Sequence, residues 1–146
     1  MKFTAVRENH LYAKAYRRGR RATGKYTATY ILRDYAAERI AKADPRRGMR
    51  NRIGLTVGKK IGGAVSRNRA KRLMREAYRT LERAGDVSHG YLVIIAARGA
   101  ILGASSGDVA ADLHRQLTAL GLIRKKAAKS DDVTAIGTQN NNSGDQ

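Results

Sequence analysis

The residues of this chain best suited to binding a ligand lie on one predicted helix, over residues 64–83. This helix is cationic along one side. Between positions 67 and 79 only Glu76 opposes a series of basic residues. At about 100° per residue, Arg67, Lys71 and Arg75 share one face, where like charges four residues apart repel each other. A solvated helix face normally mixes charges of both signs, so the pattern predicts contact with a polyanion. The polar residues placed on this side are Arg67, Asn68, Lys71, Arg72, Arg75 and Arg79, with Arg69 on the flank.

The other side of the same helix is apolar and is expected to pack on a sheet. Its residues are Ala70, Leu73, Met74, Ala77, Tyr78 and Leu81. Glycines at positions 58, 62 and 63 precede the helix and allow two interpretations. They permit backbone amides to approach phosphates closely, or they simply form a tight turn between a strand and the helix.

The charge of the whole chain supports a nucleic-acid partner. The 146 residues carry 30 Lys and Arg against 12 Asp and Glu, a net charge of +18. Self-repulsion of this size opposes compaction, and nucleic acid relieves it because each neutralised phosphate releases counterions. A membrane partner is not expected, because the sequence contains no long apolar span, signal peptide or lipidation motif.

No catalytic or metal-binding constellation is visible in the sequence. The chain has no cysteine, which excludes disulfides and thiolate chemistry and suits a cytoplasmic protein. His10, His89 and His114 are scattered, without the spacing of metal ligands, and the carboxylates are equally dispersed. Neither a G-x-S-x-G nor a Walker motif occurs. We therefore expect no catalytic residues and no metal site in the protein itself.

Hydrophobic periodicity predicts the elements that position the basic helix. The expected helices cover residues 9–18, 64–83 and 107–123, and the expected strands cover residues 25–34, 51–58 and 90–97. In the first strand, alternation places Tyr30 on the face opposite Thr29 and Ile31. The apolar run over 90–97 is typical of a strand buried on both faces.

The remaining segments are expected to be connections. Residues 1–8 form an extended or loosely ordered lead-in, residues 17–25 a basic loop, and residues 35–51 a variable connection in preference to a short helical turn. Residues 127–146, with little hydrophobic content, are expected to be a disordered tail. This division predicts one domain over residues 1–126.

Residues 57–79 resemble the signature of the protein subunit of bacterial ribonuclease P, the RNR-motif family. The matching stretches are Val57-Gly58-Lys59-Lys60-Ile61-Gly62, Ala64-Val65, Arg67-Asn68-Arg69, Lys71-Arg72 and Arg75-Glu76-Ala77-Tyr78-Arg79. Tyr12 and Tyr16, followed by Gly19, resemble the family's first helix, and residues 91–98 its late strand. The resemblance covers about residues 6–123. Tyrosine stands at two positions where the family commonly has phenylalanine.

The resemblance implies an α/β fold, a central mixed β-sheet with flanking helices similar to the second domain of ribosomal protein S5. It also implies a left-handed βαβ crossover, an exception to the usual right-handed rule. The implied function is that of the RNA-binding subunit of a ribonucleoprotein that removes the 5′ leader from precursor tRNA. Ribonuclease P RNA and its Mg²⁺ ions would carry the catalysis, and no stable protein partner is required.

Two surfaces follow from the resemblance. The residues expected to bind the catalytic RNA are Lys59, Lys60, Arg67, Asn68, Arg69, Lys71, Arg72 and Arg75. Tyr12, Tyr16 and Tyr30 are expected to line a cleft between the first helix and the sheet, where they bind the tRNA leader by stacking on unpaired bases. From the residue types alone, ordinary core packing is the commoner role of such tyrosines, and Tyr78 and Tyr91 are expected to stay in the core.

Two other functional classes use a similar basic helix. One is a structural ribosomal or RNA-chaperone protein, which restoration of precursor-tRNA cleavage by the purified protein distinguishes from a ribonuclease P subunit. The other is a DNA-binding protein that reads the major groove. The sequence argues against it, because no helix-turn-helix pair and no dimer seam are evident.

Overall fold

The computed structural model describes residues 4–6, 9–43, 50–85 and 87–123, which form a five-stranded mixed sheet with flanking helices. The strand order is β1-β4-β5-β3-β2, with β1, β4 and β5 parallel and with β3 antiparallel to both β5 and β2. The strands are β1 (Thr4–Ala5), β2 (Arg20–Thr23), β3 (Thr27–Arg33), β4 (Arg52–Thr56) and β5 (Tyr91–Ala97). The helices are α1 (Asn9–Arg18), α2 (Ala37–Ala43), α3 (Ala64–Arg83) and α4 (Ser106–Ala119), with short 3₁₀ turns η1 (Lys59–Ile61) and η2 (Gly99–Gly103).

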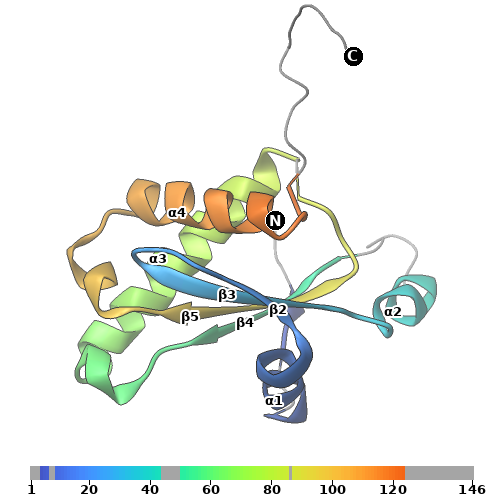
Figure 1. Ribbon diagram of the computed structural model, residues 1–146, viewed down its shortest axis with the longest axis horizontal. Helices are drawn as coiled ribbons and strands as arrows, with labels where there is room; N and C mark the ends of the chain where they lie inside the picture. The colour runs from blue at the N-terminus through green and yellow to red at the C-terminus, as the bar shows by residue number, and fades with distance from the viewer. Residues whose placement is uncertain (1–3, 7–8, 44–49, 86, 124–146) are drawn as a thin grey trace, which may run out of the picture.

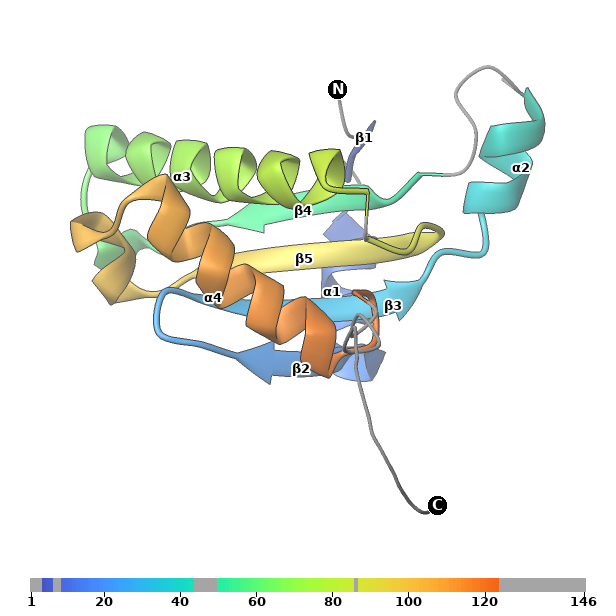
Figure 2. The same ribbon diagram turned by 90° about the horizontal axis from the view of Figure 1, so that it is seen from above.

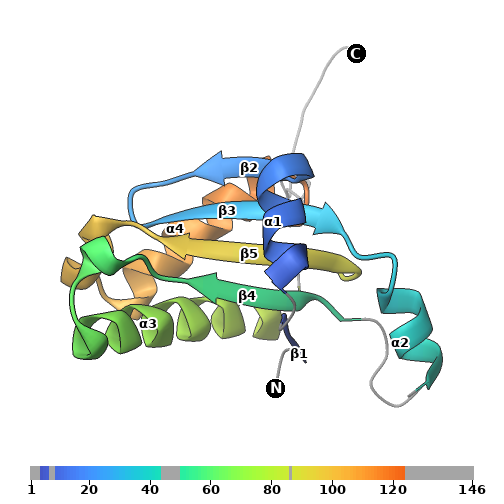
Figure 3. The ribbon, with the colours of Figure 1, turned by 90° about the horizontal axis from the view of Figure 1, so that it is seen from below.

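The helices divide the molecule into layers. Helices α3 and α4 pack side by side on one face of the sheet, and α1 crosses the opposite face (Figures 1 and 2). Seen from the α1 side, this helix runs across the strands and covers only part of their face (Figure 3). Helix α2 lies beyond the end of the sheet where β3 finishes (Figure 2). The two faces of the sheet are therefore covered unequally.

The core lies between the sheet and the α3–α4 layer. Strand β5 is central, and its residues 92–95 are buried on both faces, as its continuous apolar run predicts. Helix α3 has the predicted bounds, 64–83, because its apolar stripe matches the helical repeat over the whole length. The residues it buries are those placed on its apolar side from the sequence: Ala70, Leu73, Met74, Ala77, Tyr78 and Leu81.

Strand β4 connects through α3 to the parallel strand β5, and this crossover is left-handed. Viewed from the side that α3 covers, with the strands pointing upward, β5 lies to the left of β4 (Figure 2). Nearly all such connections in proteins are right-handed. The crossover and the mixed sheet confirm the fold implied by the sequence resemblance. The left-handed path leaves α3 over the β4 margin of the sheet (Figure 2).

The basic segment after α1 is a strand, so the loop predicted over residues 17–25 is wrong. Strand β2 pairs antiparallel with β3, from Arg20 opposite Ile31 to Thr23 opposite Ala28. It forms the edge of the sheet, and its residues are exposed or half-buried. An edge strand forms its backbone hydrogen bonds with one neighbour only and can leave its side chains in solvent. The sequence of β2 therefore shows no alternation of apolar residues from which a strand could be predicted.

One further segment differs from the expectation, and one expected to be extended joins the sheet. Residues 37–43 of the predicted variable connection form α2, and residues 4–5 of the lead-in add a parallel strand beside β4. Residues 44–49 of the same connection and the predicted tail over 127–146 lie outside the described residues. The proposed domain boundary at residue 126 lies outside them as well.

Helix α4 holds the turn between β2 and β3 through two buried polar side chains. The carboxylate of Asp112 accepts hydrogen bonds from the consecutive backbone N–H groups of residues 25–27, at 2.9 to 3.3 Å. Gln116 accepts a bond from Thr29 Oγ1 at 2.7 Å and donates to the carbonyl oxygen of Thr27 at 3.1 Å. These contacts fix the hairpin that carries Tyr30 against the helical layer.

Candidate nucleic-acid interface

The turn before α3 presents positive charge. Gly62 has a φ of 138°, which side chains rarely adopt, whereas the space beside Gly58 and Gly63 is open. Helix α3 begins after Gly63 with no side-chain cap and no acidic residue in its first turn, so the positive end of its dipole is unopposed there. Lys59 and Lys60 are exposed in η1, immediately before this helix end. Both interpretations of the glycines, close phosphate approach and a tight turn, are compatible with this geometry.

The predicted RNA-binding residues form one basic face, defined as Lys59, Lys60, Arg67, Asn68, Arg69, Lys71, Arg72 and Arg75. Asn68, Arg69, Lys71 and Arg72 are exposed, and Arg67 and Arg75 are half-buried. Within the described part of the chain, no carboxylate forms an ion pair with any cation of this face. Glu82, further along α3, pairs with His89 at 2.5 Å. The charge of the basic face is thus left uncompensated by the protein.

Tyr12 of α1 packs against Gly54 of β4 on the other side of the molecule. A Cβ atom on Gly54 of β4 would lie 2.6 Å from the Tyr12 hydroxyl and 2.7 Å from its Cε1, so only glycine leaves room for this ring. The hydroxyl donates a weak bond to the carbonyl oxygen of Val6, at 3.4 Å. Burial, and to a smaller degree the neighbouring Tyr16, raises the pKa of the Tyr12 phenol, which therefore stays neutral at physiological pH.

Tyr16 and Tyr30 complete the aromatic surface, defined as Tyr12, Tyr16 and Tyr30. Their rings meet edge to face, with centroids 4.8 Å apart. The Tyr16 hydroxyl donates to Thr56 Oγ1 at 3.2 Å, yet 44% of the residue stays exposed. The guanidinium carbon of Arg21 lies 6.0 Å from the centre of the Tyr30 ring, within the range of a cation–π contact.

Small side chains continue this surface across the sheet. Ala28 of β3 lies opposite Ala96 of β5, which lies opposite Thr56 of β4, so the three form one row. All three are half-buried and share the sheet face of Tyr30. This face is only partly covered by α1 (Figure 3). An aromatic edge beside a floor of small residues can accept a flat ring.

Helix α3, which carries most of the basic face, and α1, which carries Tyr12 and Tyr16, lie on opposite sides of the sheet (Figures 1 and 3). Strand β4 links them, because Thr56 contacts Tyr16 and the chain then turns into the 3₁₀ turn that carries Lys59 and Lys60. The structure thus brings the predicted tyrosines together and the predicted cations together, but keeps the two sets apart. Tyr78 is fully buried and Tyr91 packs against the core, as expected.

Sequence reasoning missed several residues that shape these surfaces. Gly54 beneath Tyr12 and Arg21 beside Tyr30 depend on long-range packing, which no local pattern reveals. Asp112 and Gln116 could have been found, because they interrupt the apolar stripe of the last helix with polar groups.

The described residues contain no obvious site for a metal ion or a membrane span. No three His, Cys, Asp or Glu side chains in residues 4–6, 9–43, 50–85 and 87–123 group in a way that could hold a metal ion. His10, His89 and His114 are all exposed. None of the helices in these ranges combines the length and apolar character needed to cross a bilayer.

A model of the family described as ribonuclease P matches residues 1–121. The chain belongs to the ribonuclease P protein family. A ribonuclease P protein component from Clostridium acetobutylicum is 29% identical over 123 residues, covering 84% of this chain and 93% of that protein. Its counterpart from Clostridium botulinum strain Loch Maree is 31% identical over 122 residues, covering 84% of this chain and 98% of the relative.

Solved structures of ribonuclease P proteins share the fold. The Staphylococcus aureus protein matches with a TM-score of 0.64 at 20% identity, over 84% of this chain and 100% of that one. The Thermotoga maritima protein matches with a TM-score of 0.60 at 18% identity, over 76% and 92% of the two chains. The mixed sheet and flanking helices are therefore those of ribonuclease P proteins.

Proposed function

We propose that this chain is the RNA-binding protein subunit of ribonuclease P and acts in the removal of the 5′ leader from precursor tRNA. Ribonuclease P is a metal-dependent ribonucleoprotein enzyme, and the family match places the chain in its protein component. The observation that carries the RNA-binding role is the uncompensated basic face of α3. When Lys and Arg side chains neutralise RNA phosphates, the RNA releases its bound counterions, and this release favours binding.

The basic face is proposed to bind ribonuclease P RNA. Its side chains extend from η1 to residue 75 of α3, and the part of the helix over residues 67–75 is about 12 Å long, so they can contact more than one phosphate of a structured RNA. An arginine guanidinium can donate two hydrogen bonds to one phosphate, whereas a lysine ammonium acts as a point charge. The uncapped first turn of α3 adds backbone N–H donors to the same surface.

The aromatic surface is proposed to bind the 5′ leader of precursor tRNA. Stacking of a base on a tyrosine stabilises binding by about 1–3 kcal/mol and tolerates any sequence, as a leader of variable sequence requires. The partly exposed ring of Tyr16 and the floor of Ala28, Ala96 and Thr56 supply the flat contact. The position of Arg21 beside Tyr30 supports a contact between its guanidinium and a leader phosphate.

Catalysis is assigned to the RNA, with Mg²⁺ held mainly by RNA phosphates. Within the described ranges, no three His, Cys, Asp or Glu side chains are grouped in a way that could hold a metal ion. The catalytic RNA and the leader would bind on opposite sides of one sheet. Because mature tRNA has no leader, the contact with the aromatic surface would raise the affinity of the holoenzyme for precursor tRNA over mature tRNA. The proposed holoenzyme has a cytoplasmic location and needs no further stable protein partner.

Reconstitution of cleavage tests this function. The purified chain is mixed with a bacterial ribonuclease P RNA at a Mg²⁺ concentration too low for the RNA alone, and 5′-leader release from precursor tRNA is followed on a gel. We expect the protein to restore cleavage, the protein alone to be inactive, and an unstructured basic peptide of equal charge to give no rescue. A failure to restore cleavage, or equal rescue by the peptide, contradicts the proposal.

A further inference from the structure

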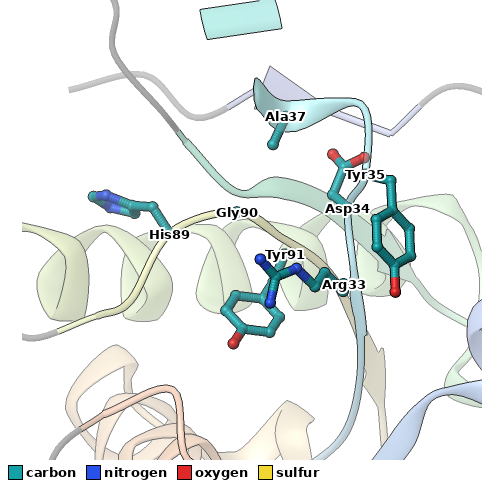
Figure 4. Close-up of a pocket in the computed structure, with 7 residues that line it drawn as sticks. All are labelled: Arg33, Asp34, Tyr35, Ala37, His89, Gly90 and Tyr91. Atoms are coloured by element: carbon teal, nitrogen blue, oxygen red, sulfur yellow. The ribbon is translucent and has the colours of Figure 1, made fainter. Parts of the chain in front are cut away.

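A pocket of about 350 Å³ lies at the corner where β3 ends, α2 begins and β5 begins (Figure 4). It lies at the end of the sheet opposite η1, beyond the reach of the residues that start α3 (Figure 2). The pocket belongs neither to the basic face nor to the aromatic surface. Pockets that hold small molecules begin at about this size, 300 Å³.

One wall of the pocket pairs a cation with an aromatic ring. Arg33 and Tyr91 are directly opposite each other in the antiparallel β3–β5 pair, so their side chains share one face of the sheet. Tyr91 is half-buried against the core, and its backbone N–H donates to Asn51 Oδ1 at 2.9 Å. Arg33 is exposed and has no ion-pair partner among the described residues. The Tyr91 side chain thus packs against the core, while the guanidinium of Arg33 beside it is available.

The carboxylate that lines the pocket does not cancel this charge. Asp34 receives two hydrogen bonds from Arg52, at 2.7 and 2.9 Å, and a third from the backbone N–H of Ala36 at 3.1 Å. The Asp34 side chain is only 3% exposed, and its negative charge is already balanced by the ion pair with Arg52. His89, on the opposite wall, is held by Glu82 at 2.5 Å. The charge left over in the pocket is the positive charge of Arg33.

A second aromatic ring stands at the mouth of the pocket. Tyr35 is 80% exposed, so its ring contributes little to the core, and it lies on the other side of Arg33 from Tyr91 (Figure 4). A large aromatic residue left this exposed beside a cation is typical of surfaces that stack on bases.

We propose that this pocket binds one unpaired ribonucleotide, with its phosphate on Arg33, beside Tyr91, and its base against Tyr35 at the mouth. The inference goes beyond the two surfaces described above by adding a third, single-nucleotide contact at the far end of the sheet. It rests on the proposed function only for the source of the nucleotide, which would be the RNA of the holoenzyme or its substrate.

The absence of tryptophan from the sequence allows a local test. Tyr35→Trp places a single indole at the mouth of the pocket while keeping a stacking ring. The full-length variant is titrated with adenosine 5′-monophosphate up to millimolar concentrations, and its tryptophan emission is recorded. We expect saturable quenching, with adenosine and inorganic phosphate each binding at least about tenfold more weakly than the nucleotide.

A second substitution in the Tyr35→Trp background identifies the phosphate contact. Arg33→Gln should weaken the nucleotide about tenfold, and Arg33→Lys should recover part of that loss. The matched control is Arg39→Gln, which removes an exposed arginine of α2 outside the pocket lining and should leave binding unchanged. Thermal unfolding of each variant checks that the fold is retained.

Three results would overturn the proposal. These are an absence of saturable quenching, equal losses for Arg33→Gln and Arg39→Gln, and quenching by a glutamate-rich peptide but not by the nucleotide. The titration uses the protein alone, so its failure leaves the cleavage reconstitution unaffected. Failure of reconstitution likewise leaves the titration interpretable.

Discussion

The rings of Tyr16 and Tyr30 meet edge to face at an interplanar angle of 89°, although one comes from α1 and the other from β3. The edge-to-face arrangement is a favoured geometry for aromatic pairs. It leaves 44% of Tyr16 exposed beside the small residues of the sheet. The two residues thus form an aromatic step on the side of the sheet opposite α3.

Tyr16→Ala should weaken binding of leader-bearing precursor tRNA to the assembled holoenzyme. Loss of one stacked base costs about 1–3 kcal/mol, which corresponds to roughly a 5- to 150-fold higher Kd. Tyr16→Phe keeps the ring and loses only the bond to Thr56, so its effect should be several-fold smaller. Filter binding with precursor and mature tRNA checks this, and equal losses for both RNAs would refute a leader contact.

Gly54→Ala should displace the Tyr12 ring, because the new methyl group would lie 2.6 Å from its hydroxyl and 2.7 Å from Ile94 Cδ1. Overpacking of this kind costs about 1–3 kcal/mol of unfolding free energy. Gly58→Ala is the matched control, since nothing lies within 4 Å of its added methyl group. Urea unfolding measures both, and similar stabilities for the two variants would contradict the close packing of Tyr12.

Arg72→Gln should reduce the salt dependence of binding to ribonuclease P RNA. Removing one phosphate contact is expected to lower the slope of log K against log salt concentration by about 1. Arg39→Gln, which removes an exposed arginine outside the basic face, should leave the slope unchanged. Binding measured between low and moderate salt distinguishes them, and matching slopes would show that overall charge alone is responsible.

Asp112→Asn should destabilise the protein strongly, by about 3 kcal/mol or more, because an amide N–H₂ would face backbone donors inside the protein. Arg115→Gln removes the ion pair of the same carboxylate, but 69% of the Arg115 side chain is exposed. That change should cost less than about 1 kcal/mol. Denaturant unfolding of both variants tests the difference, and a mild effect of Asp112→Asn would mean that the turn is held by other contacts.

The start of α4 should show a distinct acid response. Hydrogen bonds from the backbone N–H and then the side chain of Ser105 lower the pKa of Asp108 in the folded state. The ionised carboxylate therefore contributes stability above its ordinary pKa, about 3.9, and loses it as the pH falls through the lower folded value. The stability advantage over Asp108→Asn should be present at pH 6 and disappear in strong acid. A pH-independent difference would contradict this origin.

The sequence predicts the long helix and the central strand well, because both show a local pattern of apolar residues. The apolar side of α3 repeats with the helical period from Ala70 to Leu81, and β5 is apolar throughout, so both are visible locally. The spacing of Tyr12 and Tyr16 and the alternation around Tyr30 also predict one aromatic face. The resemblance, rather than periodicity, supplied the left-handed crossover.

The rest depends on contacts between distant segments. The edge strand β2 carries arginines and threonine because only its backbone needs a partner. The glycine beneath Tyr12 is more than 40 residues away in sequence, and the carboxylate that holds residues 25–27 lies at position 112. The corner pocket likewise needs β3 and β5 side by side before Arg33 meets Tyr91.

The hydrogen bonds between Asp112 and the β2–β3 turn can form only late in synthesis. The hairpin that carries Tyr30 is complete at residue 33, but the carboxylate that secures it is made about 80 residues later. At roughly 5–20 residues per second, the nascent chain waits on the order of ten seconds between these events. The basic helix, complete at residue 83, emerges earlier. A chain still on the ribosome would therefore expose its cationic helix before its tyrosine surface is secured.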